Sequence, residues 1–154
     1  MSINPYQNID TAPDYQVYEF DSIGKVTLRK RAKFELLDED DQLYNLALCT
    51  VLEDGTEDCS SASKNGDMDM VLETAAQIAL IYSNKFPDRK IFLRGSDQLR
   101  SRKYQIGINS HLMSLSATFE IEGVMINNQD EITLIETIQR GTNYQGFIFT
   151  RKPA

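Results

Sequence analysis

The stretch VTLRKRAKFELL at Val26–Leu37 decides the fold, because apolar and charged side chains alternate along it with a period of two. Successive side chains of a β-strand point to opposite faces of the sheet. We therefore expect a core face with Val26, Leu28, Ala32, Phe34 and Leu36. The opposite, open face carries Lys25, Thr27, Arg29, Arg31, Lys33 and Glu35. Lys30 interrupts the apolar set, which indicates a bulge or a strand end.

Further strand patterns flank this stretch. Tyr15–Asp21 predicts a short aromatic strand, and Ser22–Gly24 supplies the turn after it. Leu43–Leu52 is apolar on both parities, so we expect a central strand covered on both faces. Asp54-Gly55 is a strong hairpin signal, and Thr56–Ser63 would return as a polar edge strand. Four such strands in succession predict an antiparallel meander.

A long helix should follow the meander. Asp67 is the expected N-cap, and apolar residues recur at helical spacing from Met68 to about Lys85. Pro87 ends the pattern, because proline cannot continue a helix. The apolar stripe is broad, so this helix must pack on the sheet.

The last third of the chain predicts shorter elements. Lys90–Arg94 is expected as a short buried strand, and Ser96 as the cap of a helix over Asp97–Ile108. Ser110 would cap a third helix from His111 to about Phe119.

Residues Phe119–Ile126 fit helix or strand, with helix narrowly favoured, and Ile132–Ile138 and Tyr144–Thr150 predict a final hairpin. The expected fold class is α+β: an antiparallel β-meander with a long helix packed on one face, two further short helices and a C-terminal β-hairpin.

The length of 154 residues suits one domain, which we expect over residues 15–154 after a flexible N-terminal arm at residues 1–14. No apolar run approaches the roughly 20 residues needed to cross a bilayer, and the start of the chain lacks the pattern of a signal peptide. We therefore expect a cytoplasmic protein that does not bind membranes. Cys49 and Cys59 are expected as free thiols; a bridge across the predicted turn is the less favoured alternative.

Positive charge is concentrated in two short segments. The formal net charge is −7, yet of 16 Lys and Arg residues five lie in Lys25–Lys33 and seven in Lys85–Lys103. An acidic chain is unlike a general nucleic-acid binder, which is usually strongly basic. Only a local basic surface, formed if folding joins the two segments, supports an anionic partner.

The first candidate site is the strand face with Lys25, Arg29, Arg31 and Lys33. Alternate strand residues lie about 6.6–7 Å apart, close to the phosphate spacing of an extended single strand. Tyr18 and Phe20 are the candidate stacking platforms for bases. The more common alternative is that these cations balance carboxylates on neighbouring strands and deter edge pairing.

The second candidate is an anion site where a predicted strand meets a helix. Backbone N–H groups at a helix N-terminus can bind an anion, and arginine can add a bidentate contact. The residues are Arg94, Ser96, Arg100, Arg102 and Lys103. An equally weighted alternative is that Arg94 or Arg102 pairs with Asp88 or Asp97 and holds the joint.

Catalytic and metal patterns do not emerge from the sequence. His111 is the single histidine and lacks the neighbours of a hydrolase or metal motif. The acidic run Asp38–Asp41 lacks the ligand spacing of a calcium loop. We expect no catalytic residues, no metal and no cofactor, and therefore lean against an enzyme.

Several sequence blocks together suggest a known type of chain: YEFDSIGK at Tyr18–Lys25, YNLAL at Tyr44–Leu48, NGDMDMVLETAAQIALIY at Asn65–Tyr82, RGSDQLRSRKYQIGI at Arg94–Ile108 and GTNYQGFIFTRK at Gly141–Lys152. They resemble an uncharacterised family of Bacteroidetes proteins of unknown function, which implies a single bacterial domain and no established activity. The order of four strands and a helix is also similar to the half-unit of Whirly and Pur-type single-stranded nucleic-acid binders.

Together these patterns predict a non-enzymatic binding module with a local basic surface, and single-stranded DNA or RNA is the leading partner. The alternative is a protein-interaction or regulatory module, such as a homo-oligomer formed through sheet edges, that binds no nucleic acid.

Overall fold

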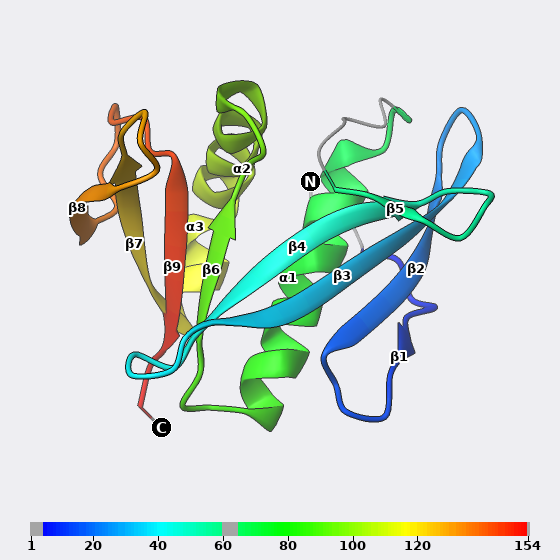
Figure 1. Ribbon diagram of the computed structural model, residues 1–154, viewed down its shortest axis with the longest axis horizontal. Helices are drawn as coiled ribbons and strands as arrows, with labels where there is room; N and C mark the ends of the chain where they lie inside the picture. The colour runs from blue at the N-terminus through cyan, green and yellow to red at the C-terminus, as the bar shows by residue number, and fades with distance from the viewer. Residues whose placement is uncertain (1–4, 60–64, 154) are drawn as a thin grey trace. The chain divides into compact units, whose positions relative to one another are not determined.

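A computed structural model describes residues 5–59 and 65–153, and it shows an α+β protein with a largely antiparallel sheet (Figure 1). The chain divides into two compact units. Unit 1 contains Met1–Glu35 and Leu46–Pro87, and unit 2 contains Leu36–Asn45 and Asp88–Ala154. A single domain over residues 15–154 therefore stays a prediction. No helix within the described ranges is long and apolar enough to cross a membrane.

Five strands belong wholly or partly to unit 1: β1 (Asp10–Thr11), β2 (Val17–Ile23), β3 (Thr27–Asp38), β4 (Leu43–Val51) and β5 (Glu57–Asp58). They neighbour one another in chain order, which matches the predicted antiparallel meander in part. The last residues of β3 and the first of β4 belong to unit 2. Of the predicted strand Thr56–Ser63, only β5 is seen, and residues 60–63 lie outside the described ranges.

The described part of the predicted N-terminal arm is held against unit 1. Strand β1 pairs with β2. The Tyr6 backbone donates to Thr74 Oγ1 at 2.9 Å, its hydroxyl donates to Asp67 Oδ2 at 2.5 Å, and its ring stacks on Phe20. Pro5–Asp14 therefore contributes to the packing of unit 1, and residues 1–4 lie outside the described ranges.

The core of unit 1 confirms the period-two pattern in the middle of β3. Ala32 and Phe34 are buried, and the Phe34 ring lies parallel to that of Tyr82 on α1 (Met68–Lys85), with centroids 3.7 Å apart. The predicted helix thus packs on the sheet as expected. Lys30 is neither a bulge nor a strand end: it is buried on the same face, and its ammonium donates to Thr50 Oγ1 at 2.7 Å.

The start of α1 is organised differently from the prediction. Asp67 occupies the N-cap position, but its side chain makes no capping bond. The carboxylate instead accepts hydrogen bonds from Ser22 Oγ at 2.6 Å and from the Tyr6 hydroxyl. Asp67 therefore ties the helix start to β2 and to the N-terminal segment.

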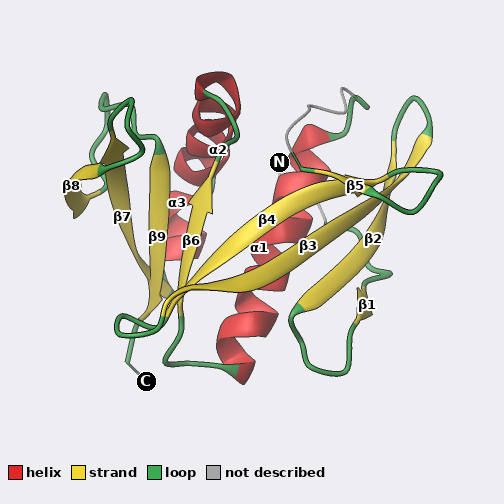
Figure 2. Cartoon of the chain, viewed as in Figure 1, coloured by secondary structure: helices red, strands yellow, loops and turns green. Residues whose placement is uncertain are grey.

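Unit 2 adds four strands and two helices (Figure 2). These are β6 (Lys90–Arg94), α2 (Gln98–Ser110), α3 (Leu112–Ser116), β7 (Phe119–Ile126), β8 (Ile132–Thr137) and β9 (Gly146–Arg151). The strand order is β4, β6, β9, β7, β8. The start of β4 pairs with β6 in parallel, and the other pairs are antiparallel.

Two predictions for unit 2 were wrong. Residues Phe119–Ile126 form strand β7, whereas helix was narrowly favoured. The expected hairpin between the last two strands does not form, because β7 pairs with both β8 and β9 and lies between them. Burial explains the order: Gly146–Phe149 are buried and need a central strand, whereas β8 is exposed almost throughout and takes the edge.

A glycine makes room for the loop that enters β9. A Cβ atom on Gly123 of β7 would lie only 2.4 Å from the Tyr144 ring. Tyr144 is itself buried, and its hydroxyl donates to Glu136 on β8 at 2.7 Å. The close approach of backbone and ring therefore requires glycine at this position.

Candidate functional site

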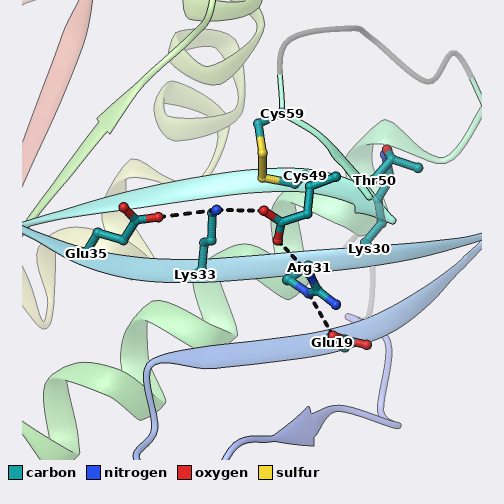
Figure 3. Close-up of a disulfide and its surroundings, with 9 residues drawn as sticks. Glu19, Lys30, Arg31, Lys33, Glu35, Cys49, Thr50 and Cys59 are labelled. Carbon is teal, nitrogen blue, oxygen red and sulfur yellow. Dashed lines mark hydrogen bonds and ion pairs between the residues drawn. A yellow bond between two sulfur atoms is a disulfide. The ribbon is translucent and has the colours of Figure 1, made fainter. Parts of the chain in front are cut away.

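The open face of unit 1 carries a ladder of ion pairs. Arg31 donates to Glu19 at 2.8 Å and to Glu57 at 2.7 Å, and Lys33 contacts Glu57 at 2.7 Å and Glu35 at 3.3 Å (Figure 3). The strand register explains the arrangement, because Glu19 on β2 lies directly opposite Arg31 on β3. Cross-strand pairs of opposite charge stabilise a sheet.

Arg29 extends the same ladder. Its guanidinium contacts Glu19 at 3.0 Å, Asp21 at 3.2 Å and the Asp10 carboxylate of β1. Three of the four predicted strand-face cations are thus matched with carboxylates, which is the alternative considered for this face. Lys25, the fourth, is exposed in the turn before β3.

The ladder shifts the ionisation of its members. Hydrogen bonds from Lys33 and then from Arg31 lower the pKa of Glu57. The same bond to Glu57, as the largest cause, raises the pKa of Lys33 and that of Arg31. Each charged form is therefore stabilised by its partners, and these cations are less available to an external anion.

The two predicted stacking platforms lie in the core. Tyr18 and Phe20 are fully buried, on the face of β2 opposite to Glu19 and Asp21. Burial raises the pKa of Tyr18 to about 12. Alternate residues of β2 point to opposite faces of the sheet, so Tyr18 and Phe20 point toward α1 when Glu19 points toward Arg31. Neither ring therefore offers an open face to a base.

The cysteine prediction was wrong, because Cys49 and Cys59 form a disulfide. The reason is the length of the turn. Leu52 and Thr56 are paired across a three-residue loop in which Gly55 has φ +86°. This loop sets the register Thr50↔Asp58, so that Cys59 comes to lie opposite Cys49.

The disulfide also belongs to a cluster of possible metal-ligating groups. The two sulfurs and a Glu57 carboxylate oxygen lie within 4.8 Å of one another. In the oxidised protein the sulfurs are bonded to each other, and Glu57 binds Arg31 and Lys33. A soft metal needs free thiolates, so the oxidised cluster does not offer a complete donor set.

The second predicted site lies in unit 2 and is arranged differently from the expectation. Asp97, and not Ser96, caps α2: its carboxylate accepts from the Arg100 backbone N–H at 2.8 Å. A carboxylate at this terminus already occupies the position that an anion would take. Ser96 is exposed, and the Arg100 side chain is buried.

The remaining cations of this segment are accessible. Arg94 forms an exposed ion pair with Asp130 at 2.9 Å. Arg102 is exposed and donates to the neutral amide of Asn143 at 3.3 Å, and Lys103 is half-buried. Within residues 5–59 and 65–153, neither Arg102 nor Lys103 forms an ion pair with a carboxylate.

Around these two cations lies a surface that the sequence did not single out. Leu99, Arg102, Lys103 and Ile106 share the outer side of α2, at helical spacings of three and four. Leu99 is 63% exposed and Ile106 is 58% exposed. We refer to these four residues as the α2 surface, which combines positive charge with aliphatic groups.

A second exposed surface of unit 2 is the edge strand β8. Ile132, Leu134 and Ile135 are each about half exposed, at 51%, 45% and 45%. Glu131 precedes them and Glu136 follows them. We refer to these five residues as the β8 surface, which is acidic and aliphatic. The sequence pattern did not indicate that β8 lies at the sheet edge, because the expected hairpin paired β8 with β9.

Comparison with the curated proteins finds no significant match, and neither does comparison with the solved structures. A family model matches residues 2–152, nearly the whole chain, and its description is "Family of unknown function (DUF6934)". The match spans both units and includes the α2 and β8 surfaces. The chain therefore belongs to the DUF6934 family of unknown function.

Proposed function

We propose that this chain is a non-enzymatic protein-interaction module that binds a second copy of itself through unit 2. The observation that carries the proposal is the complementarity of two exposed surfaces. The α2 surface has two cations between aliphatic residues, and the β8 surface has the exposed carboxylate of Glu131 beside aliphatic residues. The α2 surface of one copy therefore suits the β8 surface of another.

Two-fold symmetry allows both contacts to form at once. In a symmetric dimer, residue i of one copy contacts residue j of the other, and j contacts i. Arg102 and Lys103 of each copy would then face Glu131 of the other, while Leu99 and Ile106 meet aliphatic residues of the β8 surface. The aliphatic groups supply contact area, and the charges set orientation and partner choice.

A protein partner is favoured over a single-stranded nucleic acid by the position of the aromatic residues. Proteins that bind single strands combine cations with aromatic side chains on which bases stack. The described ranges include every aromatic residue of this chain, and each is buried or half-buried. Half-buried Tyr15 and Tyr44 already lie beneath Lys85 and Arg89. The exposed apolar groups near Arg102 are aliphatic.

Light scattering across a range of concentrations tests the proposal. We expect a dimer whose dissociation constant rises at least about tenfold when Arg102→Glu and Lys103→Glu are combined, because like charges then meet. Adding Glu131→Lys to this double variant should restore the dimer. Lys25→Glu is the matched control, since it reverses an exposed cation in unit 1.

Nucleic acid provides the opposing outcome. The element order shared with Whirly and Pur-type proteins suggests a short labelled single-stranded oligonucleotide as the second probe, measured by fluorescence anisotropy at two salt concentrations. A chain that stays monomeric and binds this oligonucleotide with steep salt dependence would overturn the proposed partner. Failure of Glu131→Lys to rescue the double variant would remove β8 from the interface.

The setting of this module is also a proposal. The resemblance of the sequence blocks to Bacteroidetes proteins supports a bacterial origin, and we place the protein in the cytoplasm. Fractionation of cells that express the full chain from its own gene tests this placement. Recovery of the chain outside the cytoplasmic fraction would contradict it.

A further inference from the structure

The disulfide of unit 1 lies beside the ion-pair ladder and is coupled to it through one short segment. Cys59 follows β5, and Glu57 lies two residues before it on the same strand side. Glu57 accepts from both Arg31 and Lys33 at 2.7 Å. Figure 3 shows the disulfide above β4 and the side chains of Arg31 and Lys33 on the neighbouring strand β3. The position of Glu57 therefore depends on how firmly β5 is held.

Strand β5 is very short. It contains two residues and pairs with β4 at Thr50↔Asp58 and Val51↔Glu57. It lies beyond the sheet path as a short addition to β4. Hairpins of this size are marginal on their own. The disulfide closes a loop with a sequence separation of 10 residues, and a cross-link of this kind shifts the balance between closed and open loop by roughly 100-fold.

We propose that the Cys49–Cys59 disulfide is a redox-sensitive latch that holds Glu57 on Arg31 and Lys33. Reduction by a dithiol releases β5, withdraws Glu57 and uncovers the two cations on the open face of unit 1. This proposal concerns a different unit from the proposed dimer and does not depend on it.

The reduction is balanced as a thiol–disulfide exchange. A thiolate of the dithiol attacks the sulfur of Cys59, which is half-buried, whereas Cys49 is almost completely buried. The S–S bond breaks, Cys49 leaves as a thiolate, and a mixed disulfide forms on Cys59. The second thiol of the reductant then releases Cys59 and closes the reductant's own disulfide. Two electrons pass to the protein, and the two dithiol protons end on the cysteine thiols.

Release of Glu57 changes the environment of Lys33 more than that of any other ladder cation. Lys33 has two carboxylate contacts, and the one that remains is Glu35 at 3.3 Å, whose side chain is 62% exposed. Exposed pairs of this kind are weak. Arg31 keeps Glu19, at 2.8 Å. The Lys33 amine should therefore become more accessible and more reactive when the latch opens.

Amine acylation mapped by mass spectrometry tests the latch in the full chain. The oxidised protein is compared with protein reduced by dithiothreitol, freed of reductant under nitrogen and treated with an acetylating ester. We expect Lys33 to react roughly tenfold faster after reduction, a conservative fraction of the shift expected from the disulfide. Lys25, which is exposed in unit 1, is the internal reference and should keep its rate.

Two variants make the result decisive. The double variant Cys49→Ser and Cys59→Ser should show the fast Lys33 rate without reductant. Glu57→Gln should show a fast rate in both redox states, because the carboxylate is then missing. Equal Lys33 rates in the oxidised and reduced wild-type protein would overturn the latch. So would loss of far-UV circular dichroism on reduction, since the disulfide would then maintain the fold rather than gate one surface.

Discussion

Replacement of Asn65 by alanine should destabilise unit 1 strongly, because this buried side chain joins the β2–β3 turn to the start of α1. Its amide nitrogen donates to the carbonyl oxygens of Val26 at 2.8 Å and Ser22 at 3.2 Å, and its amide oxygen accepts from Val26 N at 3.0 Å. Asn65 is only 4% exposed. The amide of Asn65 and these three backbone groups form a hydrogen-bonded set that alanine cannot reproduce.

The size of the destabilisation follows from the backbone groups that lose a hydrogen-bond partner when Asn65 is replaced. The Val26 carbonyl keeps a second donor, the Gly24 N–H at 3.1 Å. The Val26 N–H loses its partner, whereas the Ser22 carbonyl keeps its place opposite Leu28 in the β2–β3 ladder. Each of the three hydrogen bonds to the backbone that alanine removes contributes about 0.5–1.5 kcal/mol net. Water reaches Val26, which is largely exposed, so the total should be about 2–3 kcal/mol. This corresponds to a fall in Tm of about 4–12 °C for a chain of this size.

Urea unfolding followed by circular dichroism measures the effect. Asn65→Asp is the informative partner variant: it keeps the acceptor for Val26 N but turns a carboxylate oxygen toward two carbonyls. We expect it to lose at least as much stability as Asn65→Ala. Asn84→Ala, on the exposed side of α1, is the control and should change stability by less than about 0.5 kcal/mol. An Asn65→Ala protein as stable as this control would refute the reasoning.

Three further predictions address the ladder and the two cores. Glu57→Gln should lower stability by about 1–2 kcal/mol at pH 7, because two charge-assisted bonds in a partly exposed site are lost. The pKa of Glu57 is lowered from its ordinary 4.5. Its contribution to the free energy of unfolding is therefore present above pH 4.5 and disappears as the pH falls through the lowered pKa. The urea midpoints of wild type and variant should converge in acid, and a difference that persists there would contradict the assignment. Phe34→Ala should lower the free energy of unfolding by about 3–5 kcal/mol, since the ring is buried between Tyr18 and Tyr82. Thermal unfolding monitored by circular dichroism measures this change, and a decrease below about 1 kcal/mol would exclude the stacked arrangement. Gly123→Ala should destabilise by about 1–3 kcal/mol or more, because its Cβ meets the Tyr144 ring at 2.4 Å; an unchanged midpoint in calorimetry would show that the ring moves freely.

The elements that the sequence predicted well are those set by local pattern. The helix Met68–Lys85 has a long apolar stripe and a proline just beyond it, and the structure gives the same bounds. The middle of β3 follows its period of two. The exception, Lys30, is a buried cation whose hydroxyl partner Thr50 lies on another strand. Pattern within one strand cannot show a partner of this kind.

The elements that were mispredicted depend on pairing between distant segments. The expected hairpin of Ile132–Ile138 and Tyr144–Thr150 required β8 and β9 to pair, yet β7 lies between them. The buried run Phe147–Phe149 contained the contrary signal, since a strand that is apolar on both parities belongs in the interior of a sheet. The disulfide depended on one residue of loop length, because a two-residue turn at Asp54-Gly55 would have placed Cys49 opposite Ser60 instead of Cys59.

The ion-pair ladder shows why a row of cations is informative only together with its neighbours. Glu19 and Asp21 alternate with Tyr18 and Phe20 in β2, so burying the aromatic residues with Ala32 and Phe34 forces the carboxylates onto the face of Arg29 and Arg31. The facing of carboxylates and arginines therefore follows from the sequences of β2 and β3 once the pairing of these strands is known. Within the described ranges, Arg102 and Lys103 form no ion pair with a carboxylate, and they lie on α2 beside the exposed aliphatic residues Leu99 and Ile106. The chemistry of an available surface therefore depends on which charges the fold has already matched, and this is the reasoning behind the protein partner that we propose.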